Sequence, residues 1–280
     1  MMKRKFFFLL LVVLVIASGL LYYGSRHTTH LTNAGVEVSA GQAILIDGKT
    51  GKVLYEKAAD ERAYPASTTK IMTALLTLET LRKYDSPIGQ LVTVPEKAAG
   101  VEGSSLYLQA GEKISIEDLL YGLMLVSGND AAVTLAEIIG GDEERFVEQM
   151  NEKAEELRCS NTHFCNPNGL FDENHYTTVR DMAKIAKAAM ELPEFRKIVA
   201  TRDWKATRPE SDYLTFHNKN KTVHEFEGGN GIKIGYTKSS GRTLVASAER
   251  DGRLLICVVM SAPDWFQDAY RLMEYGFSGE

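Results

Sequence analysis

A serine and a lysine three residues apart form the pair in this sequence best suited to nucleophilic catalysis. Ser67 and Lys70 lie near the start of residues 66–82, where apolar residues recur at helical spacing. Side chains three apart on a helix share one face, so these two can meet. A serine hydroxyl is a weak nucleophile that an adjacent unprotonated amine can activate. Burial and a second cation both lower a lysine pKa, so the pair predicts another positive group close by.

Two further motifs have the residue types to complete such a site. Ser127-Gly128-Asn129 interrupts an apolar helical stretch and is the only Ser-x-Asn in the sequence; by itself it is typical of a capped helix break. Lys-Ile-Gly at residues 233–235 lies in a predicted strand, whereas a literal Lys-Thr-Gly at residues 49–51 lies upstream in a predicted hairpin turn and is interpreted as turn chemistry. In chain order, the three motifs match the set of penicillin-binding proteins and serine β-lactamases.

With its flanking residues, the chain resembles the D-alanyl-D-alanine carboxypeptidases, which are low-molecular-mass penicillin-binding proteins. The resemblance extends from about residue 41 to residue 277, and its most specific stretches are residues 64–74, 166–170, 175–178, 218–220 and 231–237. It implies that Ser67 is the nucleophile and Lys70 its base during acylation. It also implies that Ser127 relays a proton to the leaving D-alanine.

The resemblance further implies how a substrate is held. Asn129 would bind the substrate amide, Lys233 would attract the terminal carboxylate, and the backbone N–H groups of Ser67 and Tyr236 would form an oxyanion hole. The implied substrate-binding residues are Asn129, Lys233, Gly235, Tyr236 and Thr237. The implied partners are peptidoglycan stem peptides and β-lactam antibiotics, and penicillin is expected to acylate Ser67 and stay bound. No cofactor is implied.

Two departures from the family pattern affect recognition of the carboxylate. Ile234 replaces the threonine of Lys-Thr-Gly, and residues 261–268 lack the arginine that the family tends to carry there. A hydrogen bond to a charged group is worth about 1.5–3 kcal/mol, or roughly 10- to 150-fold. Such losses would weaken the reaction or redirect it, although Thr237 would partly compensate. Three alternatives therefore stay open: a DD-endopeptidase, a weakly active enzyme, and a non-catalytic wall-binding homologue.

A serine β-lactamase is the nearest rival enzyme. The class most like this chain uses a glutamate in a Glu-x-x-x-Asn pattern to activate the deacylating water. That pattern does not occur in this sequence. The sequence therefore favours a peptidase.

The elements that must position these residues follow an α+β order. Strands are predicted at residues 43–46, 53–55, 232–237, 243–248 and 254–261, and helices at residues 66–82, 115–126, 130–139, 142–157, 178–190 and 265–275. Because strands lie at both chain ends, we expect an antiparallel sheet of about five strands built from both ends, with a central helical block packed against it. The resemblance implies the β-lactamase/DD-peptidase fold.

The N-terminus predicts export. Five residues with three basic side chains precede an apolar run at residues 6–23, which is typical of a membrane anchor or of a cleaved signal peptide. We expect a linker at residues 24–40 and a catalytic domain at residues 41–280, without a C-terminal domain. The chain would then lie at the extracytoplasmic face of the bacterial membrane, or be secreted if the segment is cleaved.

Composition excludes some other classes. The net charge of −5 gives no reason to expect nucleic acid as a partner. Cys159, His163 and Cys165 offer only three ligands, and no second cluster completes them, so no metal is predicted. A Cys159–Cys165 bridge stays open, while Cys257 lies in an apolar run and is predicted to be core. The six histidines have no role in the chemistry and are interpreted as surface or structural.

Overall fold

An antiparallel sheet drawn from both ends of the chain forms the framework of the structure. The computed structural model describes residues 35–209 and 211–279, and its largest sheet has the strand order β2-β1-β9-β8-β7. These strands are β1 (Gln42–Asp47), β2 (Val53–Lys57), β7 (Gly229–Thr237), β8 (Gly241–Arg250) and β9 (Arg253–Met260). Every pairing in this sheet is antiparallel. The prediction of about five strands from both chain ends is confirmed.

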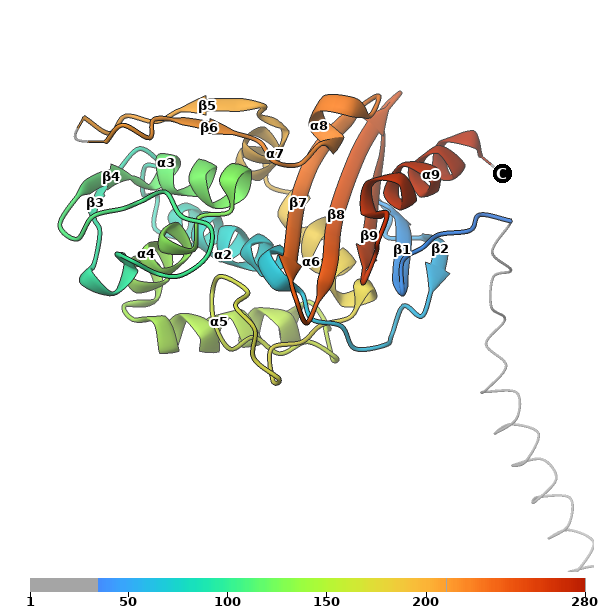
Figure 1. The fold of residues 1–280 in the computed structure, drawn as a ribbon, viewed down its shortest axis with the longest axis horizontal. Coiled ribbons are helices and arrows are strands. Elements are labelled where there is room, and N and C mark those ends of the chain that lie inside the picture. The colour runs from blue at the N-terminus through green and yellow to red at the C-terminus, as the bar shows by residue number, and fades with distance from the viewer. Residues whose placement is uncertain (1–34, 210, 280) are drawn as a thin grey trace, which may run out of the picture. The chain divides into compact units, whose positions relative to one another are not determined.

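The sheet is buried on both faces, which explains why its central strands are continuously apolar. On one face, Leu244, Ala246 and Ala248 of β8 belong to a cluster completed by α9 (Trp265–Ser278). On the other face, Val245 joins the larger cluster beneath the helical block. Figure 1 shows α9 on one side of the sheet and the helices of the block on the other. Two separate hydrophobic layers therefore hold the sheet.

The helical block follows the predicted segments closely. Its helices are α2 (Lys70–Lys83), α3 (Ile116–Tyr121), α4 (Asn129–Gly140), α5 (Glu143–Glu156), α6 (Val179–Met190) and α7 (Pro193–Ala200). Ser115, Asp142 and Thr178 each accept a backbone N–H three residues ahead, so α3, α5 and α6 begin at side-chain caps. Helix α2 is buried over most of its length and forms the centre of the block.

Several short elements were not predicted, because three or four residues are too few to show a period. They are two ribbons, β3 (Leu91–Thr93) with β4 (Lys113–Ser115) and β5 (Asp203–Lys205) with β6 (Thr215–His217), and the helical turns η2 (Glu96–Ala98) and α8 (Thr222–Glu225). The eight-residue helix α7 was also missed. Each of these lies between predicted elements and leaves their order unchanged.

The anchor or signal segment at residues 1–23 and most of the 24–40 linker lie outside the described residues. Within residues 35–209 and 211–279, no helix is long and apolar enough to cross a membrane. Cys159, Cys165 and Cys257 are free thiols, so the bridge that the sequence left open is not formed. Cys257 lies in the core, as predicted.

Candidate active site

The predicted nucleophile lies in a tight turn at the start of the central helix. Ser67 belongs to a 3-10 turn, η1 (Ala66–Thr69), which leads directly into α2 at Lys70. Residues three apart eclipse each other in a 3-10 turn, and Ser67 Oγ lies 3.0 Å from Lys70 Nζ. Ala66 enters the turn in the left-handed region at φ 48°. The helix predicted at residues 66–82 is thus present, and its first turn is tighter than expected.

The side-chain nitrogen of Lys70 is enclosed by three oxygen atoms. Besides Ser67 Oγ, Lys70 Nζ contacts Asn129 Oδ1 at 2.7 Å and the backbone carbonyl of Asn168 at 2.5 Å. The Lys70 side chain is fully buried. Burial lowers its pKa well below the ordinary value, the charge of Lys233 lowers it further, and Asp130 opposes the shift. Burial and the charge of Lys233 thus both favour the neutral amine, which is the form that can accept a proton.

Lys233 supplies the second cation that the Ser67–Lys70 pair predicted. It lies on β7, is buried, and donates to the carbonyl oxygen of Ile234 at 3.2 Å. Burial lowers the pKa of Lys233 to about 7, with a further contribution from Lys219. Lys219 also lowers the pKa of Lys70. Three lysines from distant parts of the chain therefore share one electrostatic environment.

Lys219 is the functional candidate that sequence reasoning missed. Its Nζ donates to the carbonyl oxygen of Val126 at 3.0 Å, and its backbone N–H donates to the carbonyl oxygen of Leu125. These two bonds connect the segment before Ser127 to the chain that leads into β7. The sequence placed Lys219 within a family-like stretch without assigning it a role. Its effect on the pKa values of Lys70 and Lys233 becomes evident only from its position near both of them in the folded structure.

The Ser-x-Asn motif forms another wall of the site. A π-helical turn, η3 (Gly122–Val126), ends at Ser127, which is buried and left-handed at φ 70°. Helix α4 then begins at Asn129. This turn breaks the apolar stretch where the sequence predicted an interruption, and it directs Asn129 toward Lys70. Ser127 lies two residues from Asn129 and directly after the Val126 carbonyl that Lys219 contacts.

Residues 102–104 cover Asn129 from the outside. Its backbone N–H donates to the carbonyl of Ser104 at 2.7 Å, and its Nδ2 donates to the carbonyl of Glu102 at 2.6 Å. A Cβ at Gly103 would lie only 2.7 Å from the same Nδ2 atom. The Asn129 amide is therefore oriented by Lys70 on one side and by this segment on the other.

Strand β7 passes close to the nucleophile at Gly235, a position without a side chain. A Cβ at Gly235 would lie 2.9 Å from the backbone nitrogen of Ser67 and 2.5 Å from Thr243 Oγ1. Thr243 also donates to the Pro65 carbonyl, which ties β8 to the same turn. Because β7 is the outermost strand of its sheet, alternate backbone N–H groups face away from β8 and are available to a ligand. Glycine is thus required for strand and serine to meet.

The remaining predicted site residues lie further along β7. The Tyr236 side chain is 63% exposed, and Thr237 Oγ1 contacts Ser240 Oγ at 2.8 Å within the turn to β8. Ile234 packs into the cluster beneath α9. Strand alternation places Ile234 and Lys233 on opposite faces, so the isoleucine strengthens the outer layer while Lys233 points to the helical block.

The loop at residues 166–170 packs against the turn that carries Ser67. Gly169 is left-handed at φ 86°, and a Cβ there would lie 1.9 Å from the Ala66 carbonyl oxygen. The Pro167 carbonyl accepts a hydrogen bond from Thr73 Oγ1 at 2.6 Å. The close backbone contact at Gly169 and the Thr73 side chain thus both hold the loop against the start of α2. This contact explains how the Asn168 carbonyl reaches Lys70, which the motif alone did not reveal.

His175 braces this loop from the interior. It is buried, its Nδ1 accepts the backbone N–H of Cys165 at 3.1 Å, and its Nε2 lies 2.8 Å from Thr69 Oγ1. Burial lowers its pKa to about 4. A neutral ring that donates from Nε2 satisfies both contacts. For this histidine, the structure agrees with the interpretation of a structural role.

Comparisons with known proteins point in one direction. The sequence profile of the family Peptidase_S11, described as D-alanyl-D-alanine carboxypeptidase, matches residues 27–264. The chain is 40% identical over 223 residues to the D-alanyl-D-alanine carboxypeptidase DacF of Bacillus subtilis, covering 80% of this chain and 57% of that relative. It is 33% identical over 277 residues to the D-alanyl-D-alanine carboxypeptidase of Streptomyces sp. K15, covering 94% of each.

The fold agrees with these relatives. The crystal structure of the Streptomyces K15 DD-transpeptidase superposes with a TM-score of 0.79 at 33% identity, covering 89% of this chain and 100% of that one. The D-alanyl-D-alanine carboxypeptidase DacD of Francisella tularensis superposes with a TM-score of 0.82 at 28% identity. The chain spans 57% of the length of the Bacillus relative and 63% of that of the Haemophilus influenzae relative DacA. With a family profile that matches most of its length and relatives above 30% identity, this chain belongs to the D-alanyl-D-alanine carboxypeptidase family.

Proposed function

We propose that the protein is a serine-type D-Ala-D-Ala carboxypeptidase that acts on peptidoglycan stem peptides through an acyl-enzyme. The observation that carries this proposal is the set of three contacts at Lys70 Nζ. An unprotonated amine has two hydrogens and one lone pair. The Asn129 and Asn168 oxygens accept the two hydrogens, which leaves the lone pair for the Ser67 hydroxyl. These contacts orient the Lys70 amine as a general base toward the Ser67 hydroxyl.

The reaction would proceed in two stages around this pair. Ser67 Oγ attacks the carbonyl carbon of the penultimate D-alanine while its proton moves to Lys70 Nζ, and the carbonyl oxygen takes the negative charge. The N–H groups of Ser67 and Tyr236 stabilise that oxyanion, at roughly 10²–10³ in rate per donor. Ser127 passes a proton to the amine of the departing D-alanine as the peptide bond breaks. Water then hydrolyses the ester and regenerates Ser67.

Recognition of the terminal carboxylate would fall to the lysines. Lys233, with a pKa of about 7, is partly protonated near neutral pH, and a bound carboxylate would favour its charged form. Lys219 adds positive charge beside it. This pair supports carboxypeptidase action despite Ile234 and the absence of an arginine at residues 261–268. If these lysines hold the carboxylate too weakly, the same nucleophile would serve a DD-endopeptidase.

Penicillin labelling tests the acyl-enzyme. A fluorescent penicillin should form a stoichiometric covalent adduct with the purified protein, and Ser67→Ala should abolish it. Ser160→Ala replaces an exposed serine outside the site and serves as the matched control. An adduct of normal yield on Ser67→Ala would remove Ser67 from the proposal.

Product analysis tests the substrate. Incubation with pentapeptide muropeptides should release free D-alanine and leave tetrapeptides, which mass spectrometry resolves. Cross-linked dimers offered in parallel measure endopeptidase action. Cleavage of dimers without release of terminal D-alanine would replace the carboxypeptidase proposal by the endopeptidase one. Rapid turnover of a chromogenic cephalosporin instead of a stable adduct would indicate a β-lactamase.

For location, we propose that the chain is exported and held at the extracytoplasmic face of the membrane by residues 6–23. The basic start and the apolar run support this proposal. Replacing Leu11 and Leu14 by arginine should release the protein from the membrane fraction, because each charge costs about 2.5–3.5 kcal/mol at the centre of a spanning helix. Unchanged fractionation of this double variant would contradict it. Mass spectrometry of the mature N-terminus distinguishes a retained anchor from a cleaved signal peptide.

A further inference from the structure

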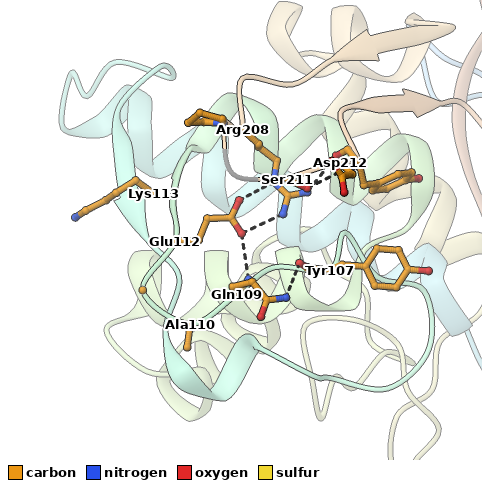
Figure 2. Close-up of a pocket in the computed structure, with 11 residues that line it drawn as sticks. Tyr107, Gln109, Ala110, Glu112, Lys113, Arg208, Ser211 and Asp212 are labelled. Atoms are coloured by element: carbon orange, nitrogen blue, oxygen red, sulfur yellow. Dashed lines mark hydrogen bonds and ion pairs between the residues drawn. The ribbon is translucent and has the colours of Figure 1, made fainter.

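A cavity of about 640 Å³ lies beside the Ser-x-Asn wall and has no place in the chemistry described above. One wall consists of Tyr107 and residues 109–113, and the other of Arg208, Pro209 and residues 211–213. Figure 2 shows the two walls facing each other, with Arg208 and Glu112 joined between them. The rings of Tyr107 and Tyr213 meet edge to face with their centroids 5.8 Å apart.

A single buried guanidinium holds the two walls together. Arg208 donates from Nε and Nη2 to the Glu112 carboxylate at 2.6 and 3.0 Å. Its Nη1 donates to the Leu106 carbonyl at 2.8 Å and to the Tyr213 carbonyl at 3.3 Å. Because the guanidinium is planar, it holds the Glu112 carboxylate and the two backbone carbonyls in fixed relative positions. The cavity is therefore formed before any ligand binds. The two tyrosines owe their relative placement to this residue.

The cavity is also connected to the acyl-transfer site. The buried carboxylate of Asp130, which follows Asn129, accepts the backbone N–H groups of Leu106 and Leu108. Asn129 itself donates to the Ser104 carbonyl. From Ser104 to Tyr107 the backbone can span no more than roughly 10 Å, because a residue advances at most about 3.3–3.6 Å. A substrate bound at Asn129 therefore lies within a few residues' length of the cavity.

Tyr107 is placed as a ligand-binding residue would be. Its side chain is 68% exposed, although its backbone is left-handed at φ 59°. Such a backbone is costly for a bulky residue, and an exposed ring contributes little to the core. The bonds from its two neighbours to Asp130 hold Tyr107 in this conformation. The strain therefore presents an aromatic face to solvent at the edge of a preformed cavity.

We propose that this cavity binds the amino-sugar chain of peptidoglycan, next to the lactyl group from which the stem peptide begins. A pyranose ring has an apolar C–H face that packs on an aromatic ring and a rim of hydroxyls that needs polar partners. Tyr107 and Tyr213 supply the rings, and Gln109, Ser211 and Asp212 supply polar groups beside them. Apart from Lys113 at the start of β4, the described wall residues lie in turns and loops, so they do not offer the extended strand edge that a peptide strand would pair with.

The length of the substrate agrees with this arrangement. A five-residue stem peptide spans at most about 17 Å when extended. With its D-alanine end at Ser67, its sugar end can therefore reach a cavity that begins a few residues beyond Asn129. The inference rests on the proposed function, since it extends the same substrate from its peptide to its glycan. It assigns to the Tyr107–Tyr213 pair a role in substrate selection.

Two substrates that differ only in the sugar test the inference. The full chain is assayed for D-alanine release from free pentapeptide and from the disaccharide-pentapeptide. Wild type should favour the disaccharide-pentapeptide in kcat/KM by about 3- to 10-fold, the size of one aromatic contact. Tyr107→Ala should bring the ratio of the two kcat/KM values close to one, while Tyr107→Phe should keep it. Tyr84→Ala removes a tyrosine of similar exposure, 67%, directly after the end of α2 and is the matched control.

Two outcomes would overturn the inference. One is an equal kcat/KM of wild type for the two substrates. The other is a Tyr107→Ala variant that lowers both values equally, which would place Tyr107 in support of the acyl site. If wild type forms the penicillin adduct but releases no D-alanine, the proposed function fails separately. Amide shifts of Tyr107 and Gln109 on titration with the peptide-free disaccharide then decide the matter, and their absence would refute glycan binding.

Discussion

Replacing Gly235 by alanine should disable acylation while leaving the fold in place. An alanine Cβ at this position would lie 2.9 Å from the Ser67 backbone nitrogen and 2.5 Å from Thr243 Oγ1. Ordinary contacts of a Cβ begin near 3.4 Å, so the strand and the serine turn must separate by about 0.5 Å or more. Gly235 is not among the left-handed glycines, so its backbone accepts alanine without strain. The effect therefore comes from the displacement alone.

The expected magnitude follows from what that displacement moves. The Ser67 N–H is one of the two proposed oxyanion donors, and the N–H of Tyr236, the next residue, is the other. Loss of one such donor costs roughly 10²–10³ in rate, and a misplacement of about 1 Å costs roughly 10²-fold. We therefore expect the second-order rate of acylation by fluorescent penicillin to fall by about 10²–10³. Overpacking should lower the free energy of unfolding by only about 1–3 kcal/mol.

The assay compares acylation rates with thermal stability. Rates are measured from gel fluorescence at several penicillin concentrations, and circular dichroism gives the midpoint of unfolding. Gly89→Ala is the matched control, because a Cβ at Gly89 meets no atom within 4 Å. A folded Gly235→Ala variant that acylates at the wild-type rate would refute the role given to this close approach.

Three further outcomes are expected. Gly169→Ala should lower the free energy of unfolding by at least about 2 kcal/mol, measured by urea denaturation, because its Cβ would lie 1.9 Å from the Ala66 carbonyl oxygen. Lys233 has a pKa of about 7 when folded and near 10.5 when unfolded, so the unfolded chain binds the extra proton. Unfolding free energy should then rise between pH 7 and 10 by up to about 1.4 kcal/mol per unit, and Lys233→Met should remove that increment. Asp130→Ala should cost about 1.5–3 kcal/mol and speed amide exchange at Leu106, whose N–H loses its acceptor; unchanged exchange would contradict this.

Motif order and strand placement could be predicted because they depend on local pattern. Continuous apolar segments marked β8 and β9, and helical spacing marked α2 and α6. The break at residues 127–129 was visible as polar and small residues within an apolar stretch. The three-residue strands of the two ribbons were invisible, because so few residues carry no period. The cavity between the ribbons was therefore invisible as well.

The catalytic pair shows the same division. Its residue types and spacing were evident, and so was the need for a second cation. Which groups surround Lys70 was not evident, because Asn129 and Asn168 lie 59 and 98 residues away along the chain. The influence of Lys219 was missed for the same reason. Contacts at such separations leave no trace in local spacing.

By itself, the sequence determined which residues could react and in what order the strands and helices follow, since both depend on side-chain chemistry and near neighbours. The tertiary structure alone decided that Lys70 is buried and its pKa lowered, that three lysines gather at one site, and that two tyrosines edge a preformed cavity. The reason is physical: desolvation and Coulomb interactions depend on distance in space, and only the packed fold brings these groups together.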